Sequence, residues 1–126
     1  MSKKAWHILF LIFTVCAFAA LIYHAIVIYC SFSKSPAPLI NLLAVLRHIL
    51  FILVNIVCIY GTLKRPKWFI WFVLVLTLQQ WYSHGSYAIT LWQQQHIVHW
   101  ISVADILLLP FLLILLIADK KNKQQA

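Results

Sequence analysis

The chain has 126 residues, of which 64% are hydrophobic and only 10% charged. About a quarter of the residues of a soluble domain are charged, so this composition excludes an ordinary soluble domain and indicates a lipid environment. The net charge of +8 comes from ten Lys and Arg against two acids, Asp105 and Asp119. Most basic residues lie at the ends of apolar segments, where topology and lipid head groups explain them, so we expect no nucleic-acid partner.

Four apolar segments follow one another along the chain, at about residues 6–30, 39–60, 68–88 and 97–118. Each is close to the roughly 20 residues that a helix needs to cross about 30 Å of hydrocarbon. Transmembrane strands would alternate apolar and polar residues, whereas these segments are continuously apolar. The sequence therefore predicts an all-α fold, a four-helix transmembrane bundle that forms a single domain over residues 1–126.

The links between the predicted helices are short. Residues 31–38 contain two prolines, which cannot extend a helix because proline lacks the backbone N–H. Residues 61–67 place Gly61 at a helix end and Pro66 in the first turn of the next helix. The third link, at about residues 89–96, contains Gln and Trp but no full charge, which favours an interfacial loop.

Basic residues indicate the orientation. If the chain crosses four times, the N-terminal tail, the second link and the C-terminal tail share one side of the membrane. Short cytoplasmic loops carry an excess of Lys and Arg. The sequence therefore predicts a multi-pass protein of the plasma or inner membrane, with both termini cytoplasmic. The predicted cytoplasmic side holds Lys3, Lys4, Lys64, Arg65, Lys67, Lys120, Lys121 and Lys123, against Lys34 alone in the outer links.

Two opposite charges lie within the predicted spans at matching depth. Arg47 and Asp105 each lie about eight residues, or roughly 12 Å, from the outer end of their helix. An unpaired charge at that depth would cost several kcal/mol. We therefore expect a buried ion pair between the second and fourth helices.

Most other polar residues of the spans also fall in the outer half of the bilayer. Gln80 and His84 are four apart and share one helix face. Such residues often only hydrogen-bond neighbouring helices, but that role gives no reason to place them all on one side. We expect an outward-facing polar pocket within the membrane, with Pro110 bending the fourth helix below it. Its expected members are His24, Arg47, His48, Gln79, Gln80, His84, Ser102 and Asp105.

This pocket favours a ligand-binding or accessory membrane protein over an enzyme. No Ser-His-Asp spacing, Gly-rich phosphate loop or metalloprotease motif is present. Two alternatives stay open. A redox protein would bind a quinone or a b-type haem. A small proton-coupled transporter would use Asp105 as its proton site. The candidate haem ligands are His24, His48, His84 and His99.

Three histidines form a candidate metal site at the outer surface. His96 and His99 are three residues apart and would share a metal ion with His84. The expected partners are the lipid bilayer and, because four short helices bury little surface, a second copy of the chain or another membrane protein.

Overall fold

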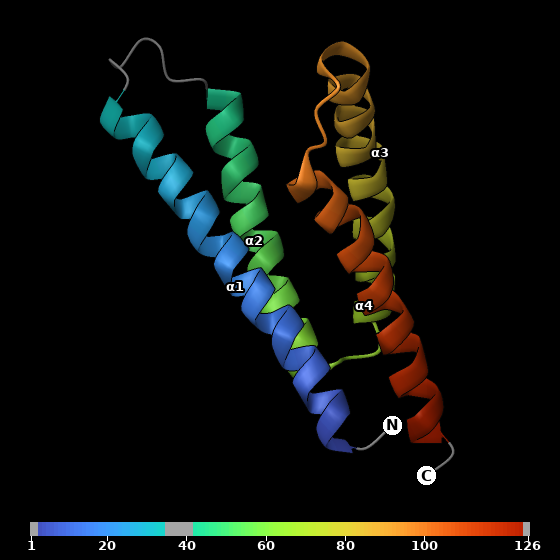
Figure 1. Ribbon diagram of the computed structural model, residues 1–126. Coiled ribbons are helices and arrows are strands. Elements are labelled where there is room, and N and C mark those ends of the chain that lie inside the picture. Colours follow the sequence, from blue (N-terminus) through green and yellow to red (C-terminus); the bar gives the residue numbers. More distant parts are fainter. Residues whose placement is uncertain (1–2, 35–41, 125–126) are drawn as a thin grey trace. The chain divides into compact units, whose positions relative to one another are not determined.

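The computed structural model describes residues 3–34 and 42–124, and every regular element in these ranges is an α-helix (Figure 1). Helix α1 covers Lys3–Lys34, α2 covers Leu42–Lys64, α3 covers Phe69–Gln95 and α4 covers Trp100–Gln124. The all-α class predicted from the sequence is therefore confirmed for the described residues.

The helices extend past the apolar segments at most of their ends. The expected interfacial loop at about residues 89–96 is wrong, because α3 continues to Gln95. Gln has a good helix propensity, so the Gln-rich segment adds a turn to α3. The helix ends at His96, whose φ of 55° is left-handed and whose N–H donates to the Trp92 carbonyl (2.9 Å). Gly61 likewise lies inside α2, not at its end. Part of the expected first link lies outside the described residues.

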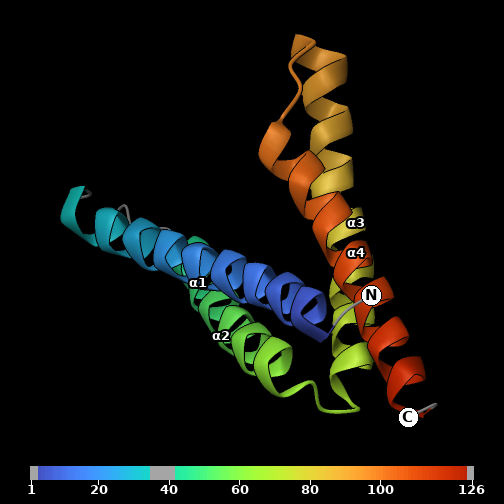
Figure 2. The ribbon, with the colours of Figure 1, turned by 60° about the horizontal axis from the view of Figure 1, so that its bottom comes forward.

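The chain divides into two compact units, Met1–Arg65 and Pro66–Ala126. In the first unit α1 and α2 pack side by side as an antiparallel hairpin, and in the second unit α3 and α4 do the same (Figures 1 and 2). Each unit is therefore an αα-hairpin.

The α1–α2 hairpin buries small and aromatic side chains. Phe10, Phe13 and Ala17 recur at helical spacing on one face of α1, and all three are buried. On α2 the hydroxyl of Thr62 is buried and lies 2.8 Å from the hydroxyl of Thr14. This interhelical hydrogen bond fixes the register of the two helices near the end of α2.

In the α3–α4 hairpin, a tryptophan of α3 supplies a hydrogen bond that a proline removes from α4. Pro110 lies inside α4 and has no N–H, so the carbonyl of Ile106 loses its usual helical donor. The indole Nε1–H of Trp81 on α3 donates to that carbonyl at 3.0 Å. The carbonyl freed by Pro110 therefore accepts a hydrogen bond from the neighbouring helix, as proline in membrane helices requires.

Three of the four helices are long and apolar enough to cross a membrane, namely α1, α2 and α4 over Lys4–Ser33, Leu42–Lys64 and Trp100–Lys123. Only a small share of each apolar stretch is buried within the structure. Such exposure would be unfavourable in water, so it is consistent with a multi-pass membrane protein whose apolar faces contact lipid. Helix α3 carries more polar residues and does not reach the same hydropathy.

Candidate functional site

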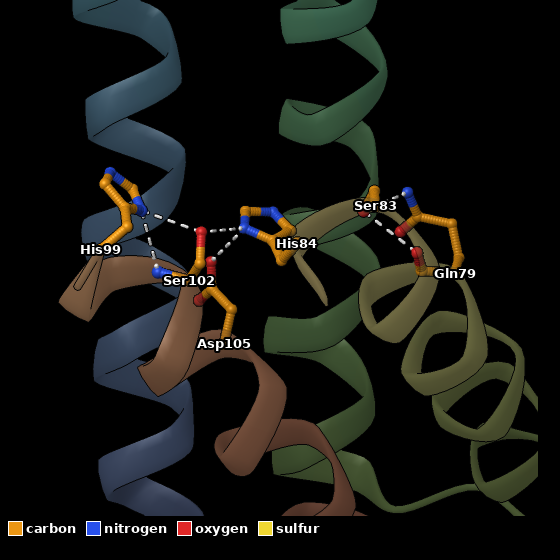
Figure 3. A network of polar contacts seen from close by, with 6 residues as sticks. All are labelled: Gln79, Ser83, His84, His99, Ser102 and Asp105. Atoms are coloured by element: carbon orange, nitrogen blue, oxygen red, sulfur yellow. Dashed lines mark hydrogen bonds and ion pairs between the residues drawn. The ribbon is translucent and has the colours of Figure 1, made fainter. Parts of the chain in front are cut away.

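A network of polar side chains connects α3 and α4 (Figure 3). His84 comes from α3, Ser102 and Asp105 from α4, and His99 from the residue just before α4. The buried hydroxyl of Ser102 lies 2.8 Å from Nδ1 of His99 and 3.1 Å from Nδ1 of His84. One hydroxyl therefore bridges two imidazole rings.

A backbone N–H of α4 determines which groups donate and which accept in this network. The N–H of Ser102 donates to Nδ1 of His99 (3.3 Å), and the N–H of Val103 donates to the His99 carbonyl (3.2 Å). His99 is thus the N-cap of α4, with its ring nitrogen as the acceptor. An accepting Nδ1 carries no proton, so the Ser102 hydroxyl donates to it. The same hydroxyl oxygen then accepts from His84, whose proton lies on Nδ1. In the neutral His84 ring, Nε2 is then an acceptor.

Asp105 makes a weaker contact with the same histidine. Its Oδ2 lies 3.6 Å from Nδ1 of His84, beyond hydrogen-bond distance, and its side chain is 39% exposed. A catalytic triad requires the serine and the carboxylate to face opposite nitrogens of the imidazole. Here Ser102 and Asp105 both face Nδ1 of His84. The arrangement therefore lacks the geometry of a Ser-His-Asp nucleophile.

Gln80 lies one helical turn before His84 on the same face of α3. Its Oε1 atom is buried and has no hydrogen-bond partner within residues 3–34 and 42–124. Most buried polar atoms are paired, and an unpaired one carries a desolvation cost of about 1–3 kcal/mol. The neighbouring Gln79 is exposed and bonds only Ser83 of its own helix (3.3 Å), on the side away from His84 (Figure 3).

The α1–α2 hairpin contains a second histidine pair. Nδ1 of His24 on α1 lies 2.9 Å from Nδ1 of His48 on α2. The ring of Phe51 stacks on His24, with centroids 5.0 Å apart, and the guanidinium of Arg47 lies 5.7 Å from the centroid of Phe51. The two Nδ1 atoms are therefore at hydrogen-bond distance, with one ring donating and the other accepting. Haem ligation by His24 and His48 stays a prediction.

The expected pocket residues thus fall into two groups. His84, Ser102 and Asp105 share one network, and Gln80 lies one turn before His84 on the same face of α3, whereas Gln79 belongs to an exposed pair. His24, Arg47 and His48 lie together in the α1–α2 hairpin, so the ion pair between Arg47 and Asp105 stays a prediction.

Sequence reasoning missed the N-cap role of His99 because histidine is not a common cap residue. It also missed Trp81 as the donor to Ile106, although Pro110 showed which carbonyl needed one. The ring of His96 lies 5.6 Å from that of Trp92 by centroids. Within residues 3–34 and 42–124, no group of three or more His, Cys, Asp or Glu side chains is arranged to hold a metal ion.

Comparison with protein-family models, with curated protein sequences and with solved structures gave no match.

Proposed function

We propose that this protein crosses the membrane four times and binds an amphipathic molecule at the polar network of α3 and α4. The molecule would present hydrogen-bond donors to this network, which lies nearer the outer side. The chain would act as a ligand-binding or accessory membrane protein.

Helix α3 is long enough to be a fourth span, although its hydropathy is lower than that of the other three helices. Its polar Thr77, Gln80 and His84 share one face, whereas Trp71, Val75, Leu78 and Tyr82 are exposed. With 27 residues it is about 40 Å long, enough for a core of about 30 Å. If α3 did not cross the membrane while the other three helices did, the C-terminal lysines would lie on the other side of the membrane from the remaining basic clusters. Four crossings keep these clusters together in the cytoplasm.

The observation that carries the proposed function is the buried Oε1 atom of Gln80, which has no hydrogen-bond partner among the described residues and lies on the face of α3 that contains His84. Gln80 Oε1 is buried without a partner, and Nε2 of His84 is an acceptor once Nδ1 donates to Ser102. These two acceptors on one face of α3 favour a ligand with hydroxyl or amine hydrogens, because a buried acceptor without a partner is costly. A quinol has two such hydroxyls, whereas a quinone has only acceptors.

The test uses matched substitutions of the two adjacent glutamines. Gln80→Met removes the unpaired buried acceptor, and Gln79→Met removes an exposed amide bonded within its own helix. A short-chain ubiquinol and its oxidised ubiquinone would be titrated against the protein in nanodiscs, with binding followed by native mass spectrometry. We expect the wild type to prefer the quinol. We expect Gln80→Met to weaken quinol binding about tenfold, or about 1.4 kcal/mol, and Gln79→Met to leave it unchanged.

Stability gives a second measurement on the same variants. Because Gln80→Met removes an unsatisfied buried atom, the ligand-free variant should be at least as stable as the wild type. Equal quinol affinity in the two glutamine variants, or a preference for the quinone, would contradict the proposed site.

We also propose the ion pair between Arg47 and Asp105 expected from their depth. Arg47→Asp and Asp105→Arg should each reduce the folded yield, and the double exchange should restore it. Folded yields unaffected by the single changes would refute this pair.

A further inference from the structure

The hydrogen bonds between His84, Ser102 and His99 form a chain in which every donor points the same way. Nδ1 of His84 donates to the Ser102 hydroxyl (3.1 Å), and that hydroxyl donates to Nδ1 of His99 (2.8 Å). The backbone N–H of Ser102 keeps Nδ1 of His99 as an acceptor (3.3 Å). The protons of both histidines are therefore determined by one serine, through its hydroxyl and its backbone N–H.

Nε2 of His84 is the ring nitrogen at which the neutral network takes up a proton. Both polar contacts of His84 in Figure 3 end on Nδ1, and Nε2 has no hydrogen-bond partner within residues 3–34 and 42–124. In the neutral ring this nitrogen has a lone pair, whereas Nε2 of His99 already carries the proton that its Nδ1 lacks. A proton added to either imidazole therefore binds at Nε2 of His84.

The added charge can lie on either histidine without moving this proton. If Nδ1 of His84 passes its proton to Ser102 and Ser102 passes its own to His99, the charge moves to His99. Each of these two protons crosses one hydrogen bond, and Nε2 of His84 keeps the added proton. The Ser102 N–H would then face a protonated Nδ1, so the charge lies more favourably on His84. In both forms Nε2 of His84 is a donor.

The titratable groups around the two histidines come from both helices of the hairpin. Asp105 of α4 lies 3.6 Å from Nδ1 of His84 and also interacts electrostatically with His99. The ring of Tyr87 on α3 packs against His99, with centroids 5.2 Å apart. A carboxylate stabilises a nearby imidazolium, so Asp105 compensates the charge that the network gains. Arg47, which we propose as the partner of Asp105, would reduce this compensation without changing the nitrogen that takes the proton.

The proton on Nε2 changes the groups that face a ligand. A quinol hydroxyl can donate to His84 only when Nε2 is unprotonated, and a quinone carbonyl can accept from His84 only when Nε2 is protonated. Histidine ordinarily changes its charge between about pH 5 and 8, whereas phenolic hydroxyls titrate near about pH 10. Over this pH range the protein therefore changes its protonation and the ligand does not.

We propose that His84 makes the ligand preference of this site depend on pH, by taking up a proton at Nε2 and changing from an acceptor to a donor. The inference rests on the ligand site proposed for α3 and α4 and adds its regulation, because the protonated protein loses the preference for a quinol. Linkage is reciprocal, so quinol binding in turn favours release of this proton. Ligand binding is thereby coupled to proton movement.

The experiment titrates ubiquinol and ubiquinone of the same short chain length against the full-length protein in nanodiscs, without oxygen, at about pH 8 and about pH 5. We expect the ratio of quinol affinity to quinone affinity to fall about tenfold from the higher to the lower pH. His84→Gln should abolish this change, because an amide contains a donor and an acceptor at both pH values. His96→Gln removes a histidine of the same hairpin that lies outside the network, and it should retain the change.

Failure of the ligand site and failure of this inference give different results. Equal affinities for quinol and quinone at the higher pH would contradict the proposed site itself. A quinol preference that persists at the lower pH would overturn only the inference, and so would a pH dependence that survives in His84→Gln, because another group such as Asp105 would then carry it. Circular dichroism checks that each protein is folded at both pH values. Nitrogen NMR of the ligand-free wild type needs no variant, and Nε2 of His84 must gain a proton as the pH falls.

Discussion

Replacing Trp81 with phenylalanine removes the indole N–H that bonds the Ile106 carbonyl and keeps most of the aromatic volume. In the wild type this donor lies 3.0 Å from the carbonyl that Pro110 leaves without its helical partner. If α4 crosses the membrane as proposed, the substitution should leave that carbonyl without a hydrogen bond in the hydrocarbon.

The size of the effect follows from the environment of the bond. Interhelical hydrogen bonds in membrane proteins contribute about 0.6 kcal/mol on average and up to about 1.7 kcal/mol. Because Pro110 removes the alternative donor, we expect a value near the upper end, about 1.5 kcal/mol. In a Pro110→Ala background the N–H of residue 110 bonds the same carbonyl, so Trp81→Phe should then cost about 0.5 kcal/mol. The two sites should be coupled by about 1 kcal/mol.

Equilibrium unfolding of the four proteins of this cycle in mixed micelles, followed by circular dichroism, measures the coupling. Trp71→Phe is the matched control, because the Trp71 side chain is also exposed and lies ten residues before Trp81 on α3. It should change the free energy of unfolding equally in both backgrounds. Additive effects of Trp81→Phe and Pro110→Ala would refute the argument that the indole replaces the missing backbone donor.

Three further substitutions test the packing and the strain. Ser102→Ala should lower the free energy of unfolding by about 1 kcal/mol, because it removes the hydroxyl that bridges two histidines. The control Ser86→Ala removes a hydrogen bond within α3 and should have little effect. Equal free energies of unfolding for the two variants would contradict this expectation. Thr62→Val should lower the free energy of unfolding by about 0.6 kcal/mol, because it removes the hydrogen bond to Thr14. The same loss in a Thr14→Val background would exclude this interhelical hydrogen bond. His96→Gly should stabilise the protein by about 0.5 kcal/mol, because glycine adopts the left-handed conformation of this residue without strain, and destabilisation would show that the contact between the His96 and Trp92 rings contributes more than the strain.

The helical elements were predictable because a chain that crosses a membrane must span the hydrocarbon and must hydrogen-bond all its backbone N–H and C=O groups internally. Few structures meet both requirements. The apolar segments gave the positions of all four helices. Their ends were less predictable, because the Gln-rich segment after residue 89 suits an interface and also a helix. Left-handed residues at Arg65 and His96 end α2 and α3, and neither is the glycine that usually marks such an end.

The candidate site was only partly predictable. Spacing placed Gln80 and His84 on one face, and depth placed Asp105 near their level, but neither shows which atoms meet. That Ser102 bridges two histidines depends on the N-cap of α4 and on side-chain rotamers, which sequence spacing does not encode. The pairing of His24 with His48 likewise depends on the register of α1 against α2. The helices were therefore predictable from local sequence, and the polar contacts were not.

The most direct test of the proposed ligand site is the proton position on its two histidines. Nitrogen NMR of histidine-labelled protein in nanodiscs distinguishes the two neutral tautomers, and His84→Gln and His99→Gln assign the signals. The network requires the His84 proton on Nδ1 and the His99 proton on Nε2, with the His84 Nε2 signal shifting when quinol is added. A proton on Nε2 of ligand-free His84 would remove an acceptor from the site and contradict the account.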